Sequence, residues 1–84
     1  MRNVTVAATQ MACTWELEKN VANAERLVRD AHSKGAQVIL IQELFAAPYF
    51  CIAQSPEHYA LAQEVANSPL IKHFSALAKE LEVV

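Results

Sequence analysis

The stretch Gln37-Val38-Ile39-Leu40-Ile41-Gln42 is a short, continuous apolar run with a polar residue at each end. Such a run is typical of a strand that is buried on both faces of a parallel sheet. A second run of apolar and β-branched residues with little charge extends from Asn3 to Met11. The two runs predict neighbouring parallel strands, which require a crossover connection between them.

The segment between these runs predicts an amphipathic helix from Leu17 to Ser33. Its apolar residues fall on one stripe at helical spacing, while charged residues cover the remaining surface. Thr14 is placed to cap the start of the helix. Gly35, the only glycine of the chain, stands where helices commonly end in a left-handed residue. Strand, helix and strand then form one right-handed crossover unit, so the predicted fold class is α/β. The stripe consists of Leu17, Val21, Ala24, Leu27, Val28 and Ala31.

The second half of the chain contains a loop and two further helix starts. Residues 43–54 hold a proline among aromatic residues and predict a loop with packed side chains. Ser55-Pro56 and Ser68-Pro69 each place a capping serine before a proline at the first helical position. The first predicts a short helix, and the second a helix that extends to about Glu80. Because Glu82 to Val84 resemble the opening of a third strand, we expect residues 1–84 to be a single partial domain, truncated at the start of that strand.

Composition excludes several classes of function. The seven Lys and Arg residues are scattered and are outnumbered by nine Asp and Glu, giving a net charge of −2; nucleic-acid binding is therefore not expected, because it requires a basic face. No apolar run approaches the roughly 20 residues of a membrane span, and the start lacks a signal-peptide pattern, so we expect a cytoplasmic protein with no membrane partner. A single glycine disfavours phosphate-binding loops.

The cysteines and histidines form no metal or redox motif. Cys13 and Cys51 are too far apart for a Cys-x-x-Cys pair, and we expect both to be reduced. Cys13 precedes a helix start, where a nucleophile is physically possible, but a small buried apolar role is favoured for both cysteines. The three histidines lack the spacing of metal ligands, so no metal site is predicted.

Glu43 is the candidate catalytic residue. Ligands of parallel sheets bind beyond the carboxyl ends of the strands, and Glu43 directly follows the apolar run of residues 38–41. A carboxylate at that place is expected to be partly desolvated, which suits a general base. The alternative is an ordinary carboxylate that caps a helix or pairs with an arginine.

The same segments resemble a known family, the nitrilase superfamily. Residues 4–11 are similar to its first strand, and residues 36–45 to its second strand and catalytic glutamate segment. Within that superfamily, Gln42-Glu43-Leu44-Phe45 followed by Ala47-Pro48-Tyr49-Phe50-Cys51 is most similar to the N-carbamoylputrescine amidohydrolases. The resemblance covers the whole chain, but members of the superfamily are several times longer, and their lysine and nucleophilic cysteine lie beyond Val84.

This resemblance implies an α-β-β-α sandwich, of which the chain is the N-terminal βαβα portion. It implies hydrolysis of a C–N bond by a Glu-Lys-Cys triad without metal or cofactor, with Glu43 as general base and Tyr49 lining the substrate pocket. Neither Cys13 nor Cys51 is the family nucleophile. The implied partner is a small carbamoylated amine, N-carbamoylputrescine, which yields putrescine, carbon dioxide and ammonia in polyamine biosynthesis, and a homo-oligomer is expected.

Two alternatives stay open. One is another amidase of the superfamily, such as a β-ureidopropionase or an ω-amidase, because the residues that separate these activities lie mostly beyond Val84. The other is a non-catalytic interaction module that kept this fold.

Hydrophobic residues make up 54% of the sequence, more than the usual ~45–50%. We therefore expect the isolated chain to aggregate, to assemble or to remain partly molten.

Overall fold

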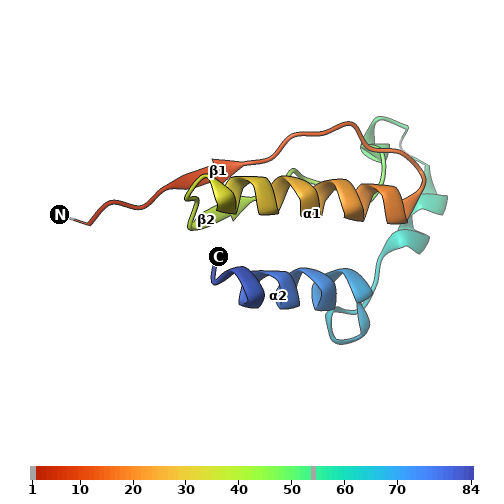
Figure 1. The fold of residues 1–84 in the computed structure, drawn as a ribbon. Coiled ribbons are helices and arrows are strands. Elements are labelled where there is room, and N and C mark those ends of the chain that lie inside the picture. Colours follow the sequence, from red (N-terminus) through yellow and green to blue (C-terminus); the bar gives the residue numbers. More distant parts are fainter. Residues whose placement is uncertain (1, 54) are drawn as a thin grey trace.

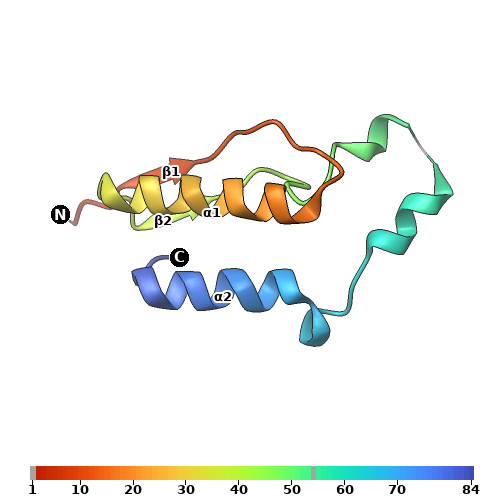
Figure 2. The same ribbon diagram turned by 45° about the vertical axis from the view of Figure 1, so that its right-hand side comes forward.

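A computed structural model describes residues 2–53 and 55–84. Two helices run side by side in the same direction, and the strands lie along the first of them (Figures 1 and 2). The connection between the second strand and the second helix projects beyond the helices (Figure 2), so the molecule is elongated, with extents of 48 × 26 × 24 Å. In chain order, the elements are β1 (Val6–Ala8), α1 (Leu17–Ser33), β2 (Val38–Leu40), the 3₁₀ helices η1 (Phe50–Ile52), η2 (Pro56–Leu61) and η3 (Val65–Asn67), and α2 (Pro69–Leu81).

The two strands pair in parallel, as predicted. Val6 lies opposite Val38, and Ala8 lies opposite Leu40. Both strands are shorter than the apolar runs that predicted them. The backbone of Val84 adds to the other edge of β2, because its N–H donates to the Gln37 carbonyl at 3.0 Å and its carbonyl accepts from the Ile39 N–H at 2.8 Å. These two bonds have the pattern of a parallel ladder, and they leave β2 in the centre.

Burial on both faces of the strands was expected, and this expectation is wrong for the described residues. Ala7 and Ile39, at the centre of each strand, are partly buried, whereas Val6 and Leu40 are each 69% exposed. Alternate side chains of a strand point to opposite faces. Helices therefore cover one face of the sheet, and the other presents apolar side chains without a covering layer.

Helix α1 has the predicted bounds but starts differently from the prediction. Its N-cap is Glu16, and no side chain caps it; the Thr14 hydroxyl accepts a hydrogen bond from the Glu16 N–H at 3.1 Å instead. The C-terminal end follows the prediction. Gly35 has φ +94°, its N–H donates to the His32 carbonyl, and the Ala36 N–H donates to that of Ala31. This is a Schellman motif, in which the left-handed residue satisfies the last carbonyls.

Helix α2 begins as the Ser-Pro pair predicts. The Ser68 hydroxyl accepts from the Ile71 N–H at 3.3 Å, and Pro69 occupies the first helical position, where no N–H is required. The other pair, Ser55-Pro56, starts only a 3₁₀ segment, and the serine side chain makes no cap. The core between the helices and the sheet is small: its buried apolar residues are Ala24, Val28, Ala36 and Leu77.

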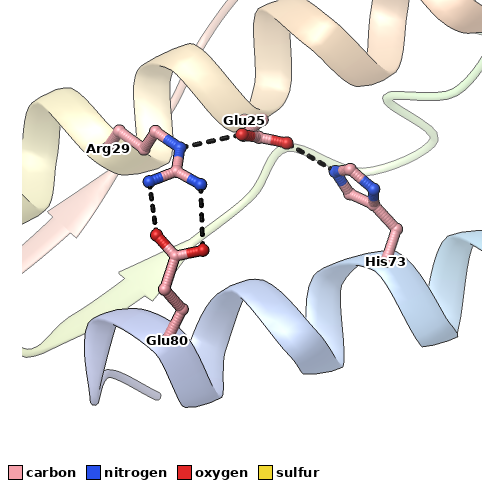
Figure 3. Close-up of polar contacts among 4 residues, drawn as sticks. All are labelled: Glu25, Arg29, His73 and Glu80. Carbon is pink, nitrogen blue, oxygen red and sulfur yellow. Dashed lines mark hydrogen bonds and ion pairs between the residues drawn. The ribbon is translucent and has the colours of Figure 1, made fainter.

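A polar network joins the exposed sides of the two helices (Figure 3). Arg29 of α1 contacts both carboxylate oxygens of Glu80 of α2, at 2.7 and 3.2 Å, and its Nε donates to Glu25 at 2.8 Å. His73 of α2 lies 2.6 Å from the other oxygen of Glu25. Hydrogen bonds from Arg29, and then from His73, hold the pKa of Glu25 below its ordinary value. The hydrogen bond from Arg29 also lowers the pKa of Glu80.

Candidate functional site

Glu43 opens a tight turn at the carboxyl end of β2, where the sequence predicted a catalytic group. Its side chain is exposed, so the expected partial desolvation is wrong for the residues that the structure describes. The reason is that no other segment described by the structure packs over its side chain. Within residues 2–53 and 55–84 the carboxylate has neither a hydrogen-bond nor an ion-pair partner, so it does not cap a helix or pair with an arginine.

The backbone next to Glu43 adopts an unusual conformation. Leu44 has φ +57°, in the left-handed region that a leucine seldom occupies. The Ala47 N–H donates to the Leu44 carbonyl at 3.3 Å and closes the turn. Strained residues of this kind persist only where the surrounding structure holds them, and they are concentrated at functional sites.

Gln42 ties the start of this turn to the segment that follows β1. Its Oε1 accepts from the Met11 N–H at 2.6 Å, and its Nε2 donates to the sulfur of Cys13 at 3.2 Å. The Cys13 thiol in turn donates to the Phe45 carbonyl at 3.2 Å. The thiol therefore links the residues on either side of Glu43 and Leu44.

Asn20 ties the end of the turn to α1. Its side chain is 1% exposed, and its Nδ2 donates to the carbonyls of Ala46, at 2.8 Å, and Thr14, at 2.6 Å. Its Oδ1 accepts from the Thr14 N–H at 2.9 Å and faces the Thr14 hydroxyl at 3.4 Å. A buried carboxamide is tolerated because its donors and acceptor are all used.

Neither Asn20 nor Gln42 was predicted from the sequence as a residue of the site. A signal for Asn20 was present, because it lies four residues before Ala24 and eight before Val28, and these are the buried positions of α1. An asparagine on a buried stripe must find hydrogen-bond partners. Gln42 entered the prediction only as the polar end of an apolar run and as part of the motif that resembles the family, and its partners lie about 30 residues earlier in the chain.

Tyr49, the candidate substrate contact, belongs to the same loop as Glu43. It directly precedes η1, and it is 53% exposed. The same loop contributes Leu44, Phe45 and Phe50 to an apolar hollow, which Trp15 and His58 line from other segments. The His58 ring stacks on Trp15, with ring centroids 5.5 Å apart. Glu43 and Tyr49 do not line this hollow.

In the parts of the chain that the structure covers, no three or more His, Cys, Asp or Glu side chains gather in a way that could hold a metal ion. No helix in those same parts is long and apolar enough to cross a membrane. Cys13 and Cys51 are both free thiols, the first partly buried and the second exposed.

Comparison with known families adds the deciding observation. The model of the carbon-nitrogen hydrolase family matches residues 5–84, nearly the whole chain. The chain belongs to the carbon-nitrogen hydrolase family. The α/β architecture with a small parallel sheet agrees with this assignment, and the resemblance to the nitrilase superfamily is confirmed.

Among individual relatives, the chain is more similar in sequence to plant N-carbamoylputrescine amidases than to a bacterial citrullinase. The chain is 57% identical over 83 residues to an N-carbamoylputrescine amidase of Solanum tuberosum and 52% identical over 83 residues to one of Arabidopsis thaliana. These alignments cover 99% of this chain and 28% of each relative. A citrullinase of Francisella tularensis is 32% identical over 84 residues, which is the whole chain and 29% of that relative. The chain thus spans under a third of the length of the curated relatives that it matches.

Proposed function

We propose that this chain is the N-terminal part of an amidohydrolase that cleaves the carbamoyl C–N bond of N-carbamoylputrescine, giving putrescine, carbon dioxide and ammonia. The observation that carries the proposal is the similarity to plant N-carbamoylputrescine amidases, at 52–57% identity over 96–99% of the chain. The citrullinase is much less similar, at 32%. The Glu43 segment lies inside the matched residues.

In this proposal, Glu43 is the general base of a Glu-Lys-Cys mechanism, and the lysine and cysteine lie outside this chain. Glu43 accepts the proton of the cysteine thiol as the sulfur attacks the carbamoyl carbon, and it returns this proton to the departing nitrogen as the C–N bond breaks. Glu43 then accepts a proton from the water that attacks the covalent intermediate, and it gives that proton to the cysteine sulfur as the C–S bond breaks and the product leaves. The lysine stabilises the negative charge on the tetrahedral oxygen. A carboxylate without structural partners at the carboxyl end of a central strand supports this role.

Tyr49 is proposed to contact the substrate. Its phenol is half exposed in the loop that carries Glu43, so it is available to a ligand at that edge of the sheet. The substrate is a small carbamoylated amine. We further propose a cytoplasmic homo-oligomer without nucleic-acid or membrane partners, and no step of the mechanism requires a metal or cofactor.

A second candidate is another amidase of the same superfamily, because the 32% identical relative is named for a different substrate. Ammonia release by the full-length protein from N-carbamoylputrescine, citrulline, N-carbamoyl-β-alanine and an ω-amide separates the candidates. The first substrate should have the highest kcat/KM. A higher kcat/KM with any of the others would transfer the assignment to that activity, and absence of turnover with all four would favour a non-catalytic interaction module.

A further inference from the structure

The position of Glu43 depends on its backbone, because its carboxylate has no partner among the described residues. That backbone is in an unfavourable conformation, with Leu44 at φ +57°. Something must therefore hold the turn. Two carboxamide side chains do so, Gln42 immediately before Glu43 and Asn20 on the far side, through the Ala46 carbonyl.

Gln42 provides the more direct of the two connections. Its Oε1 accepts the short bond from the Met11 N–H, which fixes the end of β2 to the segment after β1 beyond the last ladder pair, Ala8 and Leu40. Its Nε2 contacts the thiol of Cys13, which reaches the Phe45 carbonyl two residues past Glu43. The Gln42 side chain before Glu43 and the Phe45 carbonyl after it are thereby joined through the Cys13 thiol.

We propose that Gln42 is a positioning residue that fixes the direction in which Glu43 projects, and that it acts on turnover rather than on substrate affinity. The inference rests on the proposed role of Glu43 as general base. A general base works only within hydrogen-bond reach of its proton, at roughly 2.6–3.2 Å. A displacement of about 1 Å can cost on the order of 10²-fold in rate.

The chain offers a matched control at the other end of β2. The Oε1 of Gln37 also accepts from a backbone N–H of the neighbouring segment, that of Thr5, at 3.1 Å. Gln37 lies before β2 and Gln42 lies after it, and both make the same kind of hydrogen bond to the segment of β1. Only Gln42 is next to Glu43. Loss of either bond weakens the pairing between the β1 segment and the β2 segment. Only loss of the bond made by Gln42 should move Glu43.

The test compares Gln42→Met with Gln37→Met in the full-length protein, with N-carbamoylputrescine as substrate. Methionine keeps the length of the side chain and removes the carboxamide. Gln42→Met should lower kcat by about 10–100-fold, because a displacement of Glu43 by up to about 1 Å costs a factor of that order. We expect KM to stay within about threefold and the unfolding temperature to be similar to that of Gln37→Met. Gln37→Met should keep kcat within about twofold. An unchanged kcat in folded Gln42→Met, or an equal fall in both variants, would overturn the proposal.

Two further variants keep the result interpretable. If Gln42→Met does not fold, Gln42→Asn takes its place, because asparagine keeps the carboxamide but its side chain is shorter by one methylene. A fall in the kcat of Gln42→Asn supports the proposal, and a kcat equal to that of the unchanged protein contradicts it. Glu43→Gln is measured alongside. If Glu43→Gln retains turnover, the proposed function itself is wrong. If Glu43→Gln is inactive while the Gln42 variants turn over normally, only the positioning role is wrong.

Discussion

Asn20 and Ala46 are 26 residues apart in the sequence, yet the Nδ2 of Asn20 lies 2.8 Å from the Ala46 carbonyl oxygen. This bond connects the first turn of α1 to the loop that carries Glu43 and Tyr49. Asn20 is almost completely buried, and the loss of a hydrogen bond made by a buried group costs more than the loss of one at the surface.

Replacing Asn20 by alanine should therefore lower the free energy of unfolding of the full-length protein by about 1–3 kcal/mol, since it removes a fully buried carboxamide and its hydrogen bonds to the part-buried backbone groups of Thr14 and Ala46. Denaturant unfolding measures the change. Asn23→Ala is the matched control, because Asn23 lies on the same helix with an exposed side chain, and it should change the stability by less than about 0.5 kcal/mol. Equal losses in the two variants would show that the buried bonds contribute nothing specific.

Replacing Glu43 by glutamine keeps the shape of the side chain and removes the base. Turnover of N-carbamoylputrescine by the full-length protein should fall by roughly 10²–10⁴-fold or more, while the fold is retained. Ammonia release gives the rate, and circular dichroism gives the fold. Glu57→Gln, at an exposed glutamate of η2, should leave the rate unchanged. Near-normal ammonia release by Glu43→Gln would remove Glu43 from the mechanism.

Tyr49→Phe removes one hydroxyl and leaves the ring in place, so it should act mainly on substrate affinity. In the full-length protein, we expect KM to rise by roughly 5–20-fold with little change in kcat, as for the loss of one hydrogen bond. Tyr59→Phe is the control, because Tyr59 is 83% exposed and lies in a different segment, η2. A KM that is the same in both variants would place Tyr49 outside the substrate site.

The network of Glu25, Arg29, His73 and Glu80 should make the pairing of the helices sensitive to acid. The pKa values of Glu25 and Glu80 are below their ordinary value of 4.5 in the fold, so their contribution is fully present above about pH 4.5 and is lost as the pH falls through the lower folded values. Denaturant unfolding at pH 7 and at pH 3 should show a smaller acid-induced loss in Glu25→Gln than in the unchanged protein. An identical loss would mean that Glu25 does not contribute to acid sensitivity.

Residues 1–84 alone should neither behave as a stable monomer nor hydrolyse N-carbamoylputrescine. The bare face of the sheet exposes large apolar side chains, among them Val6 and Leu40, and such a surface favours association. Sedimentation and thermal unfolding measure the state, and a clean monomer with a sharp transition would contradict the expectation. Turnover that is abolished by Cys13→Ser or Cys51→Ser would instead identify a nucleophile within this chain.

Local sequence patterns predicted most of the fold. The apolar runs predicted the parallel strands, Gly35 the end of α1, and Ser68-Pro69 the start of α2, because each depends on residues that are close in the chain. The exposure of Glu43 and of one sheet face was not predicted, since it depends on which layers surround the sheet. Sequence placed Glu43 and Tyr49 in one loop. It could not reveal the bonds of Gln42 and Asn20 to residues distant in sequence, and the catalytic roles of Glu43 and Tyr49 stay predictions.

The glutamines that flank β2 have a consequence for how the chain avoids mispairing. The ladder between β1 and β2 is only three residues long, and a slip by one residue would exchange the inward and outward side chains of a strand whose two faces are both apolar. Apolar pattern alone hardly distinguishes the two alignments. The Gln37 side chain accepts a hydrogen bond from the Thr5 N–H, and the Gln42 side chain accepts one from the Met11 N–H. A strand shifted by one residue would lose both hydrogen bonds. The two glutamines thus favour the observed register over the register shifted by one residue.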